Sequence, residues 1–134
     1  MPFLIDTNVA IEWRDGTSAI IAAISKLADP PLISIITRIE LEGGVYRDPS
    51  HAALRRSRLD LLLTTLPVLD LPESVADRYR DIIAATGFSR RRILDRLIAA
   101  TAIVHGLTLI TINGTDFADI PNLKLEIWPA PRAQ

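Results

Sequence analysis

Short apolar runs alternate with helical segments along this chain, and this alternation restricts the fold more than any other feature of the sequence. The runs are continuous rather than alternating with polar residues, which is typical of strands buried on both faces of a parallel sheet. We expect strands at 3–6, 32–35, 68–71, 107–111 and, as a fifth, 125–128. We expect helices at about 8–13, 18–27, 37–46, 51–65, 73–85 and 90–105. This order predicts an α/β protein, a three-layer α/β/α sandwich with a central parallel sheet of four to five strands.

Turn and cap signals separate these segments. We expect Thr37 to cap its helix with Glu40 as the capping-box partner, and Ser50 to cap the helix that follows it. Gly87 and Gly106 stand where helix C-terminal glycines belong. We find no linker, internal repeat or low-complexity segment, so residues 1–134 are expected to form a single domain.

The composition removes several classes of site. The sequence contains no Cys, which excludes disulfides, zinc–thiolate sites and Cys nucleophiles. The net charge of −1 favours no particular partner, but thirteen of the fifteen basic residues are Arg, whose planar fork suits phosphate and carboxylate groups. The chain begins without a basic signal region, and no apolar run reaches membrane-spanning length. We therefore expect a soluble cytoplasmic protein that does not use a membrane.

Four acidic residues fall just after an expected strand or early in an expected helix. Ligands of such sheets bind beyond the carboxyl ends of the strands, so these side chains are candidates for one site. Each also has an ordinary explanation as a cap or turn residue. Carboxylates gathered within a few ångström repel one another and take up protons unless a cation lies among them. An all-oxygen set favours Mg²⁺ or Mn²⁺. The four residues are Asp6, Glu40, Asp95 and Asp116.

Four segments of the sequence together resemble the PIN-domain nucleases, and most closely the VapC-type toxins of bacterial toxin–antitoxin pairs. The segments are LIDTNV, ISIITRIELEGG, DRLIAATAIVHGLTLIT and NGTDF. The resemblance covers nearly the whole chain, from Phe3 to about Trp128, and it implies a PIN-like fold. It implies that Asp6, Glu40 and Asp95 are the main metal-site acids and that Asp116 is a fourth. The smaller polar residues that the family pattern places in support of the site are Thr7, Thr111 and Asn113.

The resemblance also implies an activity and partners. The chain is expected to be a Mg²⁺-dependent (or Mn²⁺-dependent) endoribonuclease, the toxin of a type II pair, which hydrolyses RNA with a metal-activated water. Its expected partners are RNA, a cognate antitoxin chain and a second copy of itself, with higher toxin–antitoxin assembly open. The helices at 8–27 and 50–65 offer an apolar surface for the antitoxin tail. One departure is Ile112, where many members carry a basic residue that contacts substrate phosphate.

A basic cluster leads into the helix that carries Asp95. It is either a contact for the nucleic-acid backbone or a solvated helix start, and the sequence does not choose between the two. The cluster consists of Arg90, Arg91, Arg92 and Arg96.

Two other functions remain open. A phosphatase with an aspartyl nucleophile would need a second acid two residues after Asp6, where this chain has Asn8. A non-catalytic PIN-like module for protein interaction would not need all four acids, and the chain retains them.

Overall fold

The computed structural model describes residues 2–131, so residue 1 and residues 132–134 of the predicted domain lie outside the described part. Strands and helices alternate along it, as the sequence predicts. The strands are β1 (Phe3–Ile5), β2 (Ile33–Ser34), β3 (Val68–Leu69), β4 (Thr108–Thr111) and β5 (Lys124–Ile127). The helices are α1 (Thr7–Arg14), α2 (Ser18–Ser25), α3 (Ile35–Arg47), α4 (Ala52–Leu63), α5 (Glu73–Thr86) and α6 (Ile93–His105). Short 3₁₀ turns are η1 (Pro49–His51), η2 (Arg90–Arg92) and η3 (Gly114–Asp116).

The strands pair in parallel throughout the described residues. β4 lies between β1 and β5, and β2 pairs with β3. A parallel bridge between Leu4 and Leu32 joins the two groups, with the N–H of Leu32 donating to the carbonyl of Phe3 at 2.8 Å. The predicted central parallel sheet is therefore confirmed, and the carboxyl ends of its strands meet at one edge.

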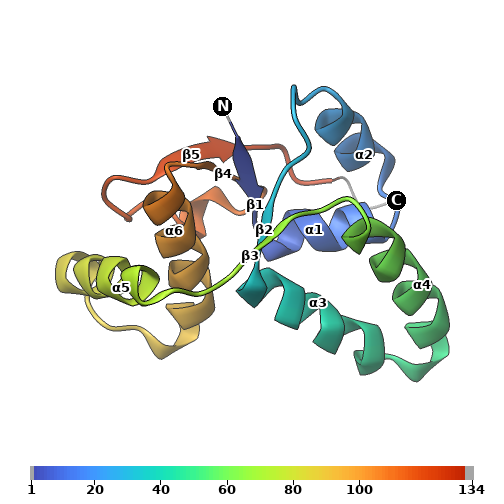
Figure 1. The fold of residues 1–134 in the computed structure, drawn as a ribbon, viewed down its shortest axis with the longest axis horizontal. Helices are drawn as coiled ribbons and strands as arrows, with labels where there is room; N and C mark the ends of the chain where they lie inside the picture. Colours follow the sequence, from blue (N-terminus) through green and yellow to red (C-terminus); the bar gives the residue numbers. More distant parts are fainter. Residues whose placement is uncertain (1, 132–134) are drawn as a thin grey trace.

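Helices cover both faces of this sheet, which gives the predicted three layers. Figure 1 shows α5 and α6 on one side of the strands and α1 to α4 on the other. Neighbouring strand residues point to opposite faces, so Leu4 and Leu109 pack in the core with α5 and α6. Ile5 and Ile110 pack in the second core, with α1 to α4. The continuous apolar runs of the sequence thus reflect strands that are buried on both faces.

Two predicted helix caps are wrong. Ser34 caps α3, since its backbone is extended and its hydroxyl accepts the N–H of Thr37 at 3.1 Å. Thr37 lies inside the first turn of α3, so the expected capping box with Glu40 does not form. After α3, Asp48 accepts the N–H of Ser50 at 3.1 Å and caps the turn η1, so Ser50 does not cap α4.

The predicted helix ends at Gly87 and Gly106 are confirmed. Gly87 follows α5 with φ of 87°, and Gly106 follows α6 in the left-handed region with φ of 64°. Both conformations favour glycine because it has no Cβ. Among residues 2–131, every helix is too short or too polar to cross a bilayer.

Candidate functional site

Asp6 joins two strands at the carboxyl edge of the sheet. It follows β1 and caps α1, where its Oδ1 accepts the N–H of Val9 at 3.0 Å. Its Oδ2 accepts the hydroxyl of Thr111 at 2.6 Å, from the end of the neighbouring strand β4. Burial raises the pKa of Asp6, the hydrogen bonds from Thr111 and Val9 oppose the rise, and the charge of Glu40 adds to it. The carboxylate is only 2% exposed, so these hydrogen bonds fix its orientation.

Glu40 reaches the same edge from α3. The hydroxyl of Thr7, at the start of α1, donates to Glu40 Oε1 at 2.6 Å. The same hydroxyl lies 3.0 Å from that of Thr37, on the first turn of α3. Because α1 follows β1 directly and α3 follows β2 directly, both helices start at the sheet edge and lie side by side there.

Asp95 comes to this region from the other layer, in the first turn of α6. Burial, followed by the negative charges of Asp116, Asp6 and Glu40, raises the pKa of Asp95 to about 6, while Arg92 opposes the rise. The structure therefore brings the other three predicted acids close enough to influence Asp95, although the four come from different parts of the chain. An ionised Asp95 is unfavourable there without a compensating positive charge.

Asp116 lies at the margin of the site. It belongs to the turn η3, and its backbone carbonyl accepts Arg92 Nη1 at 3.3 Å. The neighbouring Asn113 donates its backbone N–H to the hydroxyl of Thr111 at 2.9 Å, which supports the group that holds Asp6. Ile112, the departure from the family pattern, packs against the core of α1 to α4.

A cavity of about 360 Å³ opens at these acids and extends between α1 and α3. Three of the four predicted acids line it, and Asp116 does not. A larger groove of about 1080 Å³ lies between α2 and the segment 128–131, away from these three acids. We place the site at the smaller cavity, because charge and hydrogen-bonding groups converge on it. Its lining residues are Asp6, Thr7, Asn8, Ile11, Arg14, Asp15, Glu40, Gly44, Arg47, Arg55 and Asp95.

The donor chemistry of the cavity fits a divalent cation such as Mg²⁺. Its acids offer only oxygen ligands, and the raised pKa of Asp95 marks a place where a positive charge is favourable. Within residues 2–131, no three acidic or histidine side chains are arranged to hold an ion by themselves. Mg²⁺ commonly uses one or two protein carboxylates and keeps several waters, so it does not require three acids around it.

The predicted basic cluster is divided by the structure. Arg90 and Arg91 are exposed in the turn η2, and Arg92 is half-buried. Arg96 is 3% exposed, and its Nη1 donates to the carbonyl of Gly87 at 2.6 Å. The guanidinium of Arg96 thus contacts the end of α5 inside the fold, and the nucleic-acid contact expected of this residue stays a prediction.

Three arginines that were not predicted from the sequence line the cavity: Arg14, Arg47 and Arg55. A signal for two of them exists in the helical spacing. Arg14 stands seven residues after Thr7 on α1, and Arg47 stands seven residues after Glu40 on α3, so each shares a helix face with a predicted site residue.

Comparison with known proteins places the chain among related sequences and structures. The PIN domain family pattern matches residues 3–123. "Ribonuclease VapC2" of Rickettsia felis is 29% identical over 96% of this chain and 98% of its own length. "Ribonuclease VapC19" of Mycobacterium tuberculosis is 34% identical over 90% of this chain and 96% of its own. A crystal structure of VapBC2 from Rickettsia felis bound to a promoter DNA fragment matches 96% of this chain and 99% of its own, with 27% identity and a TM-score of 0.83.

Proposed function

The chain belongs to the PIN-domain family, and we propose that it is a metal-dependent endoribonuclease, the toxin of a type II toxin–antitoxin pair that acts in the cytoplasm. The relatives called Ribonuclease VapC support the ribonuclease activity. The similarity to a VapBC complex supports a partner chain of the antitoxin kind. The observation that carries the proposal is the meeting of Asp6, Glu40 and Asp95 at one cavity, where burial and then the charges of neighbouring acids raise the pKa of Asp95.

The acids have distinct roles in this proposal. Asp6 and Asp95 would be the central ligands of Mg²⁺ or Mn²⁺, and Glu40 would bind directly or through water. Asp116, which does not line the cavity, would complete the set from its margin. A cation held by these residues would supply a more acidic bound water as the nucleophile for a phosphodiester and a positive charge beside the phosphate oxygens.

The protein's own contribution is orientation. The hydroxyl of Thr111 and the N–H of Val9 each donate to one oxygen of Asp6, so the carboxylate keeps a fixed plane. The hydroxyl of Thr7 holds Glu40 at the start of the cavity. Asn113 supports Thr111 from the next turn. These hydrogen bonds set the side chains before substrate arrives, which reduces the reorganisation needed for reaction.

The proposed partners are RNA, a short antitoxin chain and a second copy of this chain. Arg90, Arg91 and Arg92 remain proposed contacts for the RNA backbone, since two of them are exposed beside the helix of Asp95. Co-expression with the neighbouring reading frame, followed by purification through a tag on this chain, should yield a complex with a second, small chain.

The central test uses Asp6→Asn and Asp95→Asn, which keep the size of each side chain and remove its charge. Cleavage of single-stranded RNA is measured with Mg²⁺, with Mn²⁺ and with EDTA. We expect cleavage by the unaltered protein with either metal, loss of cleavage in EDTA, and a loss of at least about a hundredfold in both variants. A phosphomonoester substrate in the same assay separates a nuclease from a phosphatase. Full activity of Asp6→Asn would contradict the proposed site.

A further inference from the structure

The cavity between α1 and α3 has two chemically different ends. On α1, one helix face carries Thr7, Ile11 and Arg14, and on α3 one face carries Glu40, Gly44 and Arg47. These faces lie against each other in the same direction, since Thr7 contacts Glu40 at one end and Arg14 lies against Gly44 at the other. The acids therefore lie at the sheet edge, and the arginines lie roughly 10 Å farther along the helices, from seven residues at about 1.5 Å each.

Arg14 has an unsatisfied donor in this cavity. The residue is 4% exposed, and its Nε donates to Asp15 Oδ1 at 3.1 Å. Its Nη1 is buried and has no hydrogen-bond partner among the described residues. A buried donor of a charged group that lacks a partner is costly, so an acceptor that pairs with Arg14 Nη1 is favoured there. Arg96 Nε also lacks a partner among the described residues, but Arg96 does not line the cavity.

Gly44 makes room for this guanidinium. A Cβ at position 44 would lie 3.0 Å from Arg14 Nη1, whereas a Cβ at the adjacent Gly43 would meet nothing within 4 Å. The carbonyl of Gly44 also accepts Arg55 Nη1 from α4 at 3.1 Å, which brings a second guanidinium to the same place.

The arginine end carries a net positive charge. Arg14, Arg47 and Arg55 line it, and Asp15 is the acid beside them. Arg47 is exposed at the last turn of α3, so it can reach a ligand that enters from solvent. Guanidinium groups bind phosphate through paired N–H donors, and a set of them is typical of phosphate recognition.

We propose that the arginine end, formed by Arg14, Arg47 and Arg55, binds a phosphate of the RNA strand that flanks the bond cleaved at the acids. This inference rests on the proposed nuclease function and adds a site that fixes the strand along the groove. Acids with a cation hold the reacting phosphate, while the arginines hold another phosphate of the same chain. The RNA strand is thereby bound in one orientation along the groove, because the two ends of the groove differ in charge.

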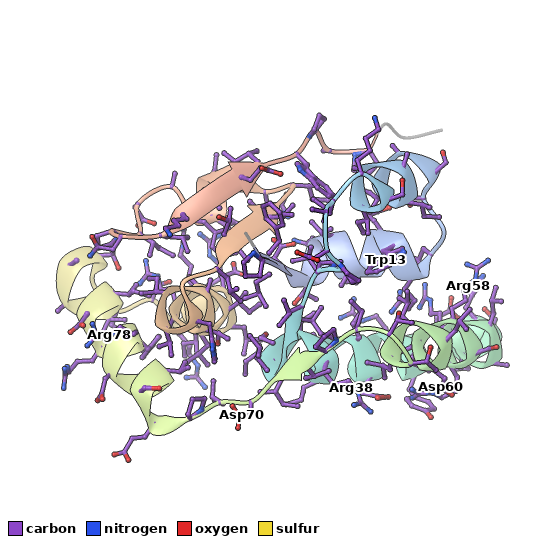
Figure 2. The ribbon with its side chains drawn as sticks, turned by 45° about the horizontal axis from the view of Figure 1, so that its top comes forward. Trp13, Arg38, Arg58, Asp60, Asp70 and Arg78 are labelled. Carbon is purple, nitrogen blue, oxygen red and sulfur yellow. The ribbon has the colours of Figure 1, made fainter. Side chains whose placement is uncertain are left out.

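The test compares Arg47→Gln and Arg14→Lys with a matched control, Arg78→Gln. Arg78 is exposed on α5, at the end of the molecule opposite to α4, and pairs with Asp81 at 3.2 Å (Figure 2). Arg47→Gln removes an exposed charge and leaves the core untouched, while Arg14→Lys keeps the charge and removes the fork. Thermal unfolding establishes that each variant is folded. If Arg14→Lys does not fold, the result for Arg47→Gln alone tests the proposed phosphate site.

Two readouts separate binding from chemistry. Anisotropy of a labelled single-stranded RNA in EDTA measures binding without cleavage, and cleavage with Mg²⁺ gives KM and kcat. We expect Arg47→Gln to weaken binding and raise KM by about fivefold to tenfold, with little change in kcat. The slope of log affinity against log salt should fall by about 0.7, the value for one lost contact to a single strand. Arg78→Gln should match the unaltered protein.

Neutral linkages locate the contact. RNAs that carry one methylphosphonate, placed at successive positions, should bind the unaltered protein more weakly at one position away from the cleaved bond. Arg47→Gln should no longer distinguish that RNA from the all-phosphate strand.

The outcomes for the two proposals are distinct. Variants that bind and cleave like Arg78→Gln would overturn the phosphate site and leave the nuclease intact. An unaltered protein that binds RNA through Arg47 but fails to cleave with any metal would refute the nuclease and keep the phosphate site.

Discussion

The adjacent glycines Gly43 and Gly44 allow the use of the groove to be tested by a pair of matched substitutions. Both lie in the interior of α3, and neither has positive φ. Replacing either by Ala improves helix propensity by about 1 kcal/mol. The two positions differ in what the new methyl group meets. At Gly43 it meets nothing within 4 Å, and at Gly44 it lies 3.0 Å from Arg14 Nη1.

The magnitudes follow from this difference. Gly43→Ala should stabilise the protein by about 1 kcal/mol, which corresponds to a rise in melting temperature of about 4 °C for a domain of this size. Gly44→Ala should show a smaller rise, because the guanidinium of Arg14 has to move by a few tenths of an ångström in a buried position. The same movement displaces Arg14 from the proposed phosphate, so KM for RNA should rise about threefold to tenfold.

Thermal unfolding and cleavage kinetics are measured on the same preparations of both variants. Gly43→Ala serves as the control, since it changes the same helix by the same methyl group without touching the cavity. Equal KM values for the two variants would refute the reasoning about Arg14. A Gly43→Ala protein that is no more stable than the original would refute the energetic basis of the comparison.

Three further changes test other parts of the structure. The pKa of Asp95 is raised to about 6 from 3.8, so the metal-free native state binds more protons than the unfolded state, and stability should fall as pH rises from about 4 to about 6. Asp95→Asn should remove this loss, and its melting temperature in EDTA should exceed that of the original protein at pH 8 but not at pH 4. Ser34→Ala removes the cap of α3 and should cost about 1 kcal/mol in urea unfolding. Arg96→Gln should lower stability by about 2 kcal/mol because the carbonyl of Gly87 loses its donor, while KM for RNA in the folded fraction stays unchanged.

The fold was predictable because local and long-range signals agree. Continuous apolar strands, helices between them and glycines after α5 and α6 all favour the same layered arrangement. The residue at which α3 begins was not predictable, because the cap of a helix depends on where the preceding strand ends. Ser34 and Thr37 are both good caps, and only the pairing of β2 with β3 places the extended backbone at Ser34.

The position of Asp6 at the sheet edge was predictable and the interior contact of Arg96 was not, for one physical reason. The carboxyl ends of parallel strands meet at one edge whatever the details of packing, so residues such as Asp6 are located by topology alone. Arg96 is located by a contact between α6 and the carbonyl of Gly87 at the end of α5. No local pattern in the sequence distinguishes this arginine from the exposed Arg90 and Arg91.

The basic end of the groove is a consequence of the same parallel topology. Two helices that run side by side from one sheet edge bring their corresponding ends together. Asp6, the cap of α1, and Glu40 on α3 therefore line one end of the groove, and the arginines of the last turns, Arg14 and Arg47, line the other end. Each end of the groove gathers side chains mainly of a single charge, so each end is unfavourable without a ligand. The two ends require ligands of opposite charge. A cation suits the acids and an anion suits the arginines. A phosphodiester chain with a divalent cation supplies both at once, which is why one groove of this polarity favours nucleic acid over a neutral or cationic substrate.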